Sequence, residues 1–317
     1  MAINLVHYLH DDQACWGVAH VHGISPMAGS YASTAELIAS GEADWRAAHG
    51  KSPSLPYADV RLLSPVTAPA RLLCQGANYR QHMIESGLNP DEKSFNMFFE
   101  KSDCSLNAPT GKVRRPAHVS LLDYEIELGL VFKTAITGPV TVTDADLHKY
   151  VFGLVIANDI SARDVQLPQM QFFKGKSYRG FCPVGPYLAV LEPSDFRYLD
   201  QLTLTLTVNG EVRQQDSTAN LVYKPAETIT ELSTFSDVAP GDLLLTGTPS
   251  GCALRVPPPF LRRLMQLLLN EKKLWAVFKR TQGRRPQYLK PGDTVTATIA
   301  SADRVIDLGE QRVGIDG

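Results

Sequence analysis

Three carboxylates, Asp123, Glu125 and Glu127, alternate with apolar residues in the stretch Leu122–Leu128. In a β-strand alternate side chains point to the same face, so these acids would share one face at a spacing of about 7 Å. Two like charges at about 4 Å repel by roughly 4 kcal/mol at an effective dielectric near 20, so acids that converge require a cation. The alternative is an exposed antiparallel strand whose acidic face is solvated.

A further carboxylate, Asp159, follows the nearly continuous apolar run 150–158, which predicts a strand buried on both faces. Burying a carboxylate at the end of such a strand is costly unless a cation or several donors meet it. The alternative is a turn aspartate before the next helix, although Ser161 offers the better N-cap. With Glu125 and Glu127, Asp159 would supply three hard oxygen ligands. No His or Cys lies beside these acids, which favours Mg²⁺ or Mn²⁺ over Zn²⁺ or copper.

Basic side chains elsewhere in the chain could complete such a site. Three carboxylates and a divalent ion leave a net charge of about −1, so an anionic substrate needs nearby cations, for which Lys101 and Lys176 are candidates. His82 and Glu85 are three residues apart and share a face if their segment is helical. Such a pair orients an imidazole and raises its basicity, which suits a general base acting on water. The alternative is a solvated surface pair.

Composition limits the possible functions. The chain has 317 residues, 44% of them hydrophobic, and a formal net charge of −2, which gives no reason to expect nucleic acid or an anionic membrane as a partner. The five cysteines are far apart in the sequence, which argues against a disulfide framework and a zinc site. Neither a secretion signal nor an apolar run long enough to span a membrane is present, so we expect a cytoplasmic protein.

Local patterns predict the elements that must position these residues. Residues 1–65 are loosely patterned and interpreted as a small N-terminal module, and residues 66–317 as the main domain. Alternating Leu and Thr over 202–208, followed by Asn209-Gly210, predict a β-hairpin. Many strand signals and few long helices predict a β-rich α+β fold rather than a doubly wound parallel sheet.

Together, these motifs resemble the fumarylacetoacetate hydrolase (FAH) superfamily. The resemblance rests on five segments in the family's order: Gly76-Ala77-Asn78-Tyr79 with His82, Asp123-Tyr124-Glu125-Ile126-Glu127-Leu128, Ala157-Asn158-Asp159-Ile160-Ser161-Ala162-Arg163-Asp164, Gly175-Lys176-Ser177, and Leu245-Thr246-Gly247-Thr248-Pro249-Ser250-Gly251. It implies a mixed β-sandwich roll, usually a homodimer. It also implies a Mg²⁺ or Mn²⁺ site with Glu125, Glu127 and Asp159 as ligands and Asp123 as an acid that does not ligate. The residues expected to reach the substrate are Tyr79, Lys101, Lys176 and Thr248.

The resemblance implies enolate chemistry on a small anionic keto acid. Our first hypothesis is a metal-dependent hydrolase that cleaves a carbon–carbon bond in a 2,4-diketo acid, such as an acylpyruvate from aromatic catabolism. His82, oriented by Glu85, would deprotonate water, and Lys176 would stabilise developing negative charge. The alternatives are isomerisation, hydration or decarboxylation of a 2-keto acid such as oxaloacetate, and a catalytically idle ligand-binding protein.

One segment departs from the family pattern. Residues 260–287 form an insertion with apolar residues near helical spacing and many basic residues against a single acid, Glu271. The basic residues are Arg262, Arg263, Lys272, Lys273, Lys279, Arg280, Arg284 and Arg285. The insertion either covers part of the core or dimer interface with a solvated basic face, or forms a cationic rim that steers anionic substrates.

Overall fold

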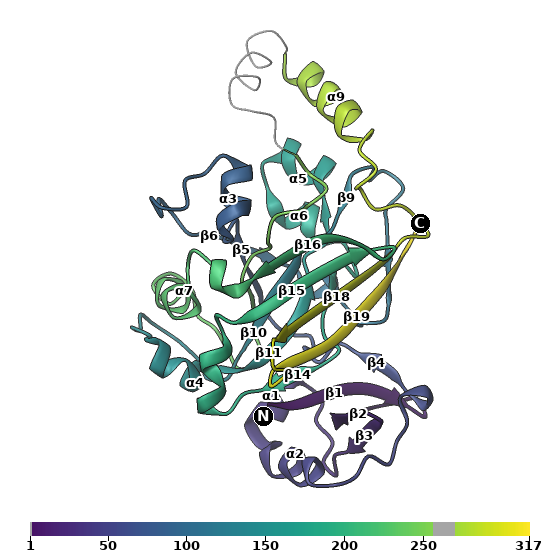
Figure 1. Cartoon of the computed structure of the whole chain (residues 1–317), viewed down its shortest axis with the longest axis vertical. Coiled ribbons are helices and arrows are strands. Elements are labelled where there is room, and N and C mark those ends of the chain that lie inside the picture. The colour runs from purple at the N-terminus through teal and green to yellow at the C-terminus, as the bar shows by residue number, and fades with distance from the viewer. Residues whose placement is uncertain (1, 256–269) are drawn as a thin grey trace.

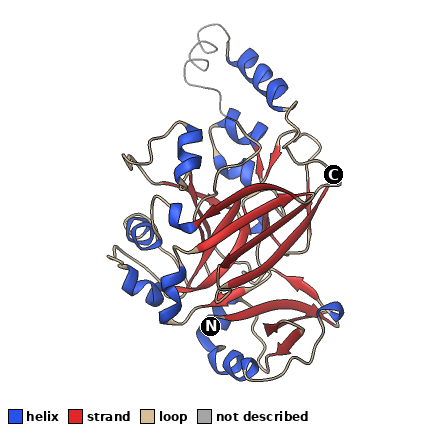
Figure 2. Ribbon diagram, in the orientation of Figure 1, coloured by secondary structure: helices blue, strands red, loops and turns tan. Residues whose placement is uncertain are grey.

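Two β-sheets face each other across the main core of the protein (Figures 1 and 2). The structure is a computed structural model and describes residues 2–255 and 270–317. Within these residues, the strands outnumber the helices and most helices are short. The predicted β-rich α+β fold is therefore confirmed.

The larger sheet runs in the order β3-β2-β1-β14-β11-β10-β17-β5-β6, with β4 paired to β1. Its strands are β1 (Ile3–His10), β2 (Gln13–His20), β3 (Gly23–Pro26), β4 (Arg61–Leu63), β5 (Leu72–Gly76), β6 (Met97–Lys101), β10 (Ile126–Phe132), β11 (Val151–Asn158), β14 (Leu188–Val190) and β17 (Leu243–Leu245).

The smaller sheet runs in the order β16-β15-β18-β19-β8. Its strands are β8 (Lys112–Arg114), β15 (Leu202–Val208), β16 (Glu211–Ser217), β18 (Thr294–Ser301) and β19 (Asp307–Asp316). Two short pairs complete the strands: β9 (Leu122–Asp123) with β12 (Ser161–Ala162), and β7 (Leu106–Asn107) with β13 (Cys182–Pro183).

The helices connect and cover these sheets (Figure 2). They are α1 (Thr34–Ser40), α2 (Glu42–His49), α3 (Arg80–Ser86), α4 (Leu147–Tyr150), α5 (Arg163–Gln169), α6 (Phe172–Lys176), α7 (Pro225–Leu232) and α9 (Glu271–Gln282). No helix in the described part of the chain is long and apolar enough to cross a membrane.

The core follows from the strand patterns. Every residue of β11 is buried, as the apolar run predicted, because β11 lies in the middle of the larger sheet. The leucines of β15 are buried and its threonines more exposed, because alternate residues face the core and the solvent. The predicted hairpin is also confirmed: β15 and β16 pair across Asn209 and Gly210, both with positive φ.

The N-terminal strands extend the larger sheet, because β1 pairs antiparallel with β14. In this pairing Ile3 lies opposite Val190 and Leu5 opposite Leu188. Leu37 and Trp45, from α1 and α2, share a buried cluster with core residues of the sheet. The proposed division near residue 65 remains a prediction.

The insertion lies partly outside the described residues, which exclude 256–269 and therefore Arg262 and Arg263. Its described part contains α9, which projects from the end of the molecule where α3, α5 and α6 lie (Figure 1). Trp275 packs edge-to-face on Phe278, with 5.6 Å between ring centroids, and Phe278 reaches the main core. The charged residues of this helix remain exposed.

Candidate metal centre

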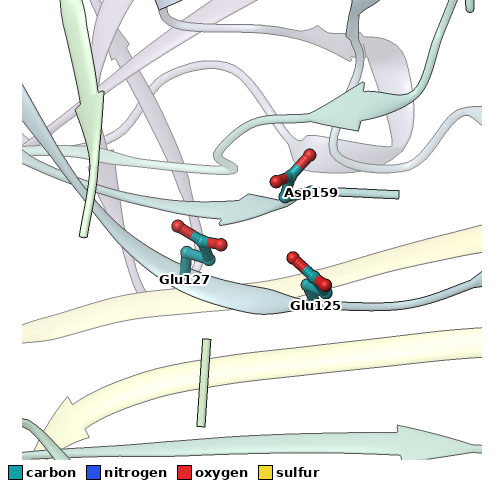
Figure 3. Close-up of side chains that lie close together, drawn as sticks. All are labelled: Glu125, Glu127 and Asp159. Atoms are coloured by element: carbon teal, nitrogen blue, oxygen red, sulfur yellow. The ribbon is translucent and has the colours of Figure 1, made fainter. Parts of the chain in front are cut away.

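Three carboxylates meet inside the protein (Figure 3). Glu125, Glu127 and Asp159 each offer one oxygen within 4.8 Å of the others. Their exposed fractions are 5%, 1% and 0%, so the alternative of a solvated acidic face is wrong. The donors are all carboxylate oxygens, the ligand type that Mg²⁺ and Mn²⁺ prefer, so these residues fit a hard divalent cation.

The backbone around these acids explains why they converge. The single strand expected over 122–128 is interrupted: β9 ends at Asp123 and β10 begins at Ile126. Between them the amide of Glu125 donates to Asn158 Oδ1 at 3.0 Å, and the amide of Asp159 donates to the carbonyl of Glu125 at 2.8 Å. These bonds fix the chain before β10 to the end of β11, which brings Asp159 beside the two glutamates.

Both predicted lysines lie beside the carboxylates. Lys101 Nζ donates to Asp159 Oδ1 at 2.6 Å and to the carbonyl of Phe181 at 3.0 Å. Lys176 Nζ donates to Glu125 Oε2 at 2.8 Å and also pairs with Asp159. The two lysine side chains are only 0% and 3% exposed, so their charges act on the acids with little solvent screening.

Arg163 is a third buried cation, which belongs to one of the family motifs but for which the sequence suggested no role. Its Nε donates to Asp123 Oδ2 at 2.9 Å, and its Nη2 pairs with Glu125. The Asp123 carboxylate also accepts the amides of Ala253 at 2.7 Å and Leu254 at 3.0 Å. Asp123 is therefore fully engaged by the protein and lies outside the converging group.

The helix after Asp159 begins differently from the prediction. Ser161 lies in β12, and its hydroxyl donates to the carbonyl of Asp159 at 2.9 Å. Helix α5 begins at Arg163 with Ala162 as its N-cap, without a side-chain cap bond. The predicted Ser161 cap is wrong because pairing with β9 holds that residue in an extended conformation.

The buried charges shift the pKa values of the acids in opposite directions. Burial opposes ionisation of Glu125, but the charges of Arg163 and Lys176 outweigh burial and lower its pKa to about 2. Burial and the charges of Asp159 and Glu125 raise the pKa of Glu127 well above its usual value. A divalent cation among these carboxylates would favour the ionised form of Glu127.

His82 and Glu85 both lie on α3, three residues apart as predicted. The Nδ1 atom of His82 is buried and makes no hydrogen bond to any described residue. In particular, it makes no hydrogen bond to Glu85. Burial lowers the pKa of His82, and the charge of Glu125 opposes this effect in part. The imidazole is therefore neutral at pH 7 and able to accept a proton.

Tyr79 and Thr248, the other two residues predicted to bind the substrate, differ in whether their hydroxyl groups form hydrogen bonds within the protein. The Tyr79 hydroxyl is buried and has no hydrogen-bond partner among the described residues. Thr248 Oγ1 donates to the carbonyl of Ile126 at 2.9 Å and accepts from Gln214 Nε2 at 2.8 Å. The Tyr79 hydroxyl therefore has no protein partner among the described residues, whereas the Thr248 hydroxyl is occupied by the protein itself.

Comparison with known proteins identifies the family. The family model described as fumarylacetoacetate (FAA) hydrolase C-terminal matches residues 71–315. This chain belongs to that family. The fumarylacetoacetate hydrolase from Exiguobacterium antarcticum has a similar structure, with a TM-score of 0.72 and 26% identity over 99% of both chains.

Curated relatives place the chain among enzymes. Oxaloacetate tautomerase YisK of Bacillus subtilis is 38% identical over 207 residues, which are 64% of this chain and 67% of that protein. The human mitochondrial oxaloacetate tautomerase FAHD2A is 35% identical over 225 residues, or 69% of this chain and 68% of that protein. These relatives favour the isomerase alternative over the carbon–carbon hydrolase that was our first hypothesis.

Proposed function

We propose that this protein is a divalent-metal-dependent tautomerase that interconverts the keto and enol forms of oxaloacetate or a closely similar 2-keto acid. The main support for this proposal is the buried group of three carboxylates, Glu125, Glu127 and Asp159. Lys101 and Lys176 form ion pairs with members of this group. Such a site suits a small, anionic, oxygen-rich ligand. The tautomerase relatives support this choice of reaction.

Different residues of the site would bind the metal ion and accept the proton. A divalent ion held by the three carboxylates would polarise the 2-keto group and make the neighbouring C3 hydrogen more acidic. His82, neutral because burial lowers its pKa, accepts the proton as the C3–H bond breaks. The electron pair of that bond forms the C2–C3 double bond, and the π pair of the C2 carbonyl moves to its oxygen. Delivery of the proton from His82 to this oxygen gives the enol and restores the neutral imidazole.

The ammonium groups stabilise the negative charge that develops on the substrate. Lys101 and Lys176 are buried, and each already donates to Asp159. Buried cations of fixed position stabilise developing charge more strongly than solvated ones. The pKa of Lys176 is raised by Asp159 and Glu125 against the effect of burial, so Lys176 remains charged at pH 7.

The test is a panel of substrates with Mg²⁺ or Mn²⁺. Decay of the enol form of oxaloacetate, followed by its ultraviolet absorbance, should accelerate with metal, return to the uncatalysed rate with a chelator, and be lost in Asp159→Asn. Acylpyruvate cleavage and oxaloacetate decarboxylation are measured on the same preparations. Cleavage of acylpyruvates without acceleration of enol decay would refute tautomerisation and restore the hydrolase hypothesis.

A further inference from the structure

Gln214 is a buried polar residue at a position where an apolar side chain would be expected. It is the only buried residue of β16, the edge strand of the smaller sheet, and it lies opposite Leu206 of β15. The register of the hairpin shifts at this point, so Arg213 has no partner in β15. A β-bulge of this kind redirects a side chain, and Gln214 is only 1% exposed. Burying a side-chain amide is costly unless its groups are hydrogen-bonded, so the partners of Gln214 identify its role.

These partners surround Ile126, the residue between Glu125 and Glu127. Gln214 Oε1 accepts the amide of Ile126 at 3.0 Å. Gln214 Nε2 donates to Thr248 Oγ1 at 2.8 Å, and the Thr248 hydroxyl in turn donates to the carbonyl of Ile126 at 2.9 Å. The two side chains therefore satisfy both backbone polar groups of Ile126.

Ile126 needs these partners because β17 does not extend far enough to pair with it. On the side of β10 that faces β17, strand pairing ends at Gly129. The carbonyl of Leu128 still accepts the amide of Thr246 on this side at 3.1 Å, and Ile126 faces the same side because alternate residues of a strand do so. A buried backbone N–H without an acceptor is strongly unfavourable, so Gln214 takes the place of the missing strand. It thereby fixes the backbone between the two glutamates.

Gln214 also fixes the loop after β17, which binds Glu127 directly. Gln214 Nε2 donates to the carbonyl of Pro249 at 2.9 Å as well as to Thr248. In the same loop, the amide of Gly247 donates to Glu127 Oε2 at 2.7 Å. Gln214 therefore acts on Glu127 both through the neighbouring backbone and through this loop.

We propose that Gln214 is a positioning residue of the metal centre, which holds Glu125 and Glu127 so that their oxygens converge with that of Asp159. This inference rests on the metal centre of the proposed function but not on the reaction that the centre performs. It means that the smaller sheet helps to shape a site whose carboxylates lie in or next to strands of the larger sheet.

Gln214→Met tests this inference, because methionine has a similar volume but can neither accept from Ile126 nor donate to the loop. Calorimetric titration of the folded variant with Mg²⁺ and with Mn²⁺ should show an affinity about 10- to 100-fold lower than that of the wild type, the usual effect of losing an outer-shell contact. A substitution that only destabilised the fold would leave the metal affinity of the folded molecules unchanged.

Gln311→Met is the matched control. Gln311 is also 1% exposed and lies in the smaller sheet, on β19. Its Nε2 donates to the carbonyls of Ile156, Pro183 and Gly185, none of which lies in the loop after β17 or is adjacent in the chain to a carboxylate of the centre. Urea denaturation without metal should show that both substitutions lower the free energy of unfolding, whereas only Gln214→Met should lower the metal affinity.

Thr248→Val is a second variant, which decides the question if Gln214→Met does not fold. It removes the hydroxyl that binds the carbonyl of Ile126 and keeps the shape of the side chain. Its metal affinity should fall in the same direction as in Gln214→Met, by a smaller factor. Unchanged metal affinity in folded Gln214→Met, or in Thr248→Val if the first variant does not fold, would overturn the inference.

The outcomes separate this inference from the proposed function. Weaker metal binding in Gln214→Met, together with a wild type that does not accelerate enol decay, supports the positioning role and refutes the tautomerase. Metal-dependent enol decay with wild-type metal affinity in Gln214→Met refutes the positioning role alone. An equal loss of affinity in Gln311→Met would also refute it, because the effect would then come from general loosening of the smaller sheet. A wild type that binds neither ion would refute both.

Discussion

Asp123 is a buried acid beside the three converging carboxylates but not one of them, and its substitution should destabilise the fold and largely spare the metal site. Its Oδ1 accepts the amides of Tyr124 at 2.9 Å and Ala253 at 2.7 Å. Its Oδ2 accepts Arg163 Nε at 2.9 Å and the amide of Leu254 at 3.0 Å. In Asp123→Asn the amide oxygen can accept the hydrogen bonds of one of the two carboxylate oxygens. The new NH₂ group replaces the other oxygen and cannot accept the hydrogen bonds that were donated to it.

The magnitude follows from these contacts. Charge-assisted hydrogen bonds contribute about 1.5 to 3 kcal/mol each, and removing one partner of a buried ion pair costs about 3 to 5 kcal/mol. We therefore expect Asp123→Asn to lower the free energy of unfolding by about 3 to 5 kcal/mol. The affinity for Mg²⁺ or Mn²⁺ should fall by only about tenfold, the lower end of the usual effect of outer-shell substitutions, because Asp123 acts on Glu125 only through Arg163.

Urea denaturation measures the free energy of unfolding, and calorimetric titration of the folded protein measures its affinity for the metal ion. Asp91→Asn is the matched control for stability, because its ion pair with Arg80 is exposed and screened by solvent, so its loss should change the free energy of unfolding far less than Asp123→Asn does. Asp159→Asn is the control for the metal and should lose more than about 100-fold in affinity. A loss of metal affinity in Asp123→Asn equal to that in Asp159→Asn would show that the wrong three acids have been assigned. An unchanged unfolding free energy would refute the role of Asp123 as a structural acceptor.

Three further predictions test other parts of the molecule. His82→Ala should lower kcat for enol decay by about 10² to 10⁴, the usual contribution of a positioned base, with metal affinity retained; an unchanged kcat would exclude His82 as the base. Burial lowers the pKa of His7 in the native state below its ordinary value of 6.5. As the pH falls below 6.5, His7 therefore binds a proton more readily in the unfolded chain than in the native state, and the free energy of unfolding decreases. Urea denaturation across that range should therefore show a shallower pH dependence in His7→Gln, and an identical dependence would contradict this reasoning. Changing Lys272 and Lys273 to Gln should lower kcat/KM at low salt and flatten its salt dependence if the insertion steers anions, since screening acts over about 8 to 10 Å near physiological salt. Salt profiles that match the wild type would leave the insertion a structural role only.

The sequence by itself determined the local features of this protein. Period-two alternation fixed β15, and the Asn209-Gly210 turn fixed its partner, because both depend on residues that are neighbours in the chain. The apolar run 150–158 similarly determined a strand buried on both faces, observed as β11. From the family motifs alone, the acids and lysines of the candidate centre were predicted to belong to one site.

Only the tertiary structure decided which groups bind one another. Nothing near Arg163 in the sequence indicates that it bridges Asp123 and Glu125, 40 and 38 residues away. Nor does local pattern reveal that β1 joins the larger sheet at β14, or that Arg255, before the insertion, and Arg285, near its end, line one cavity. These outcomes depend on pairing and burial between distant segments, whose free energies are set by the whole fold and not by any window of the sequence.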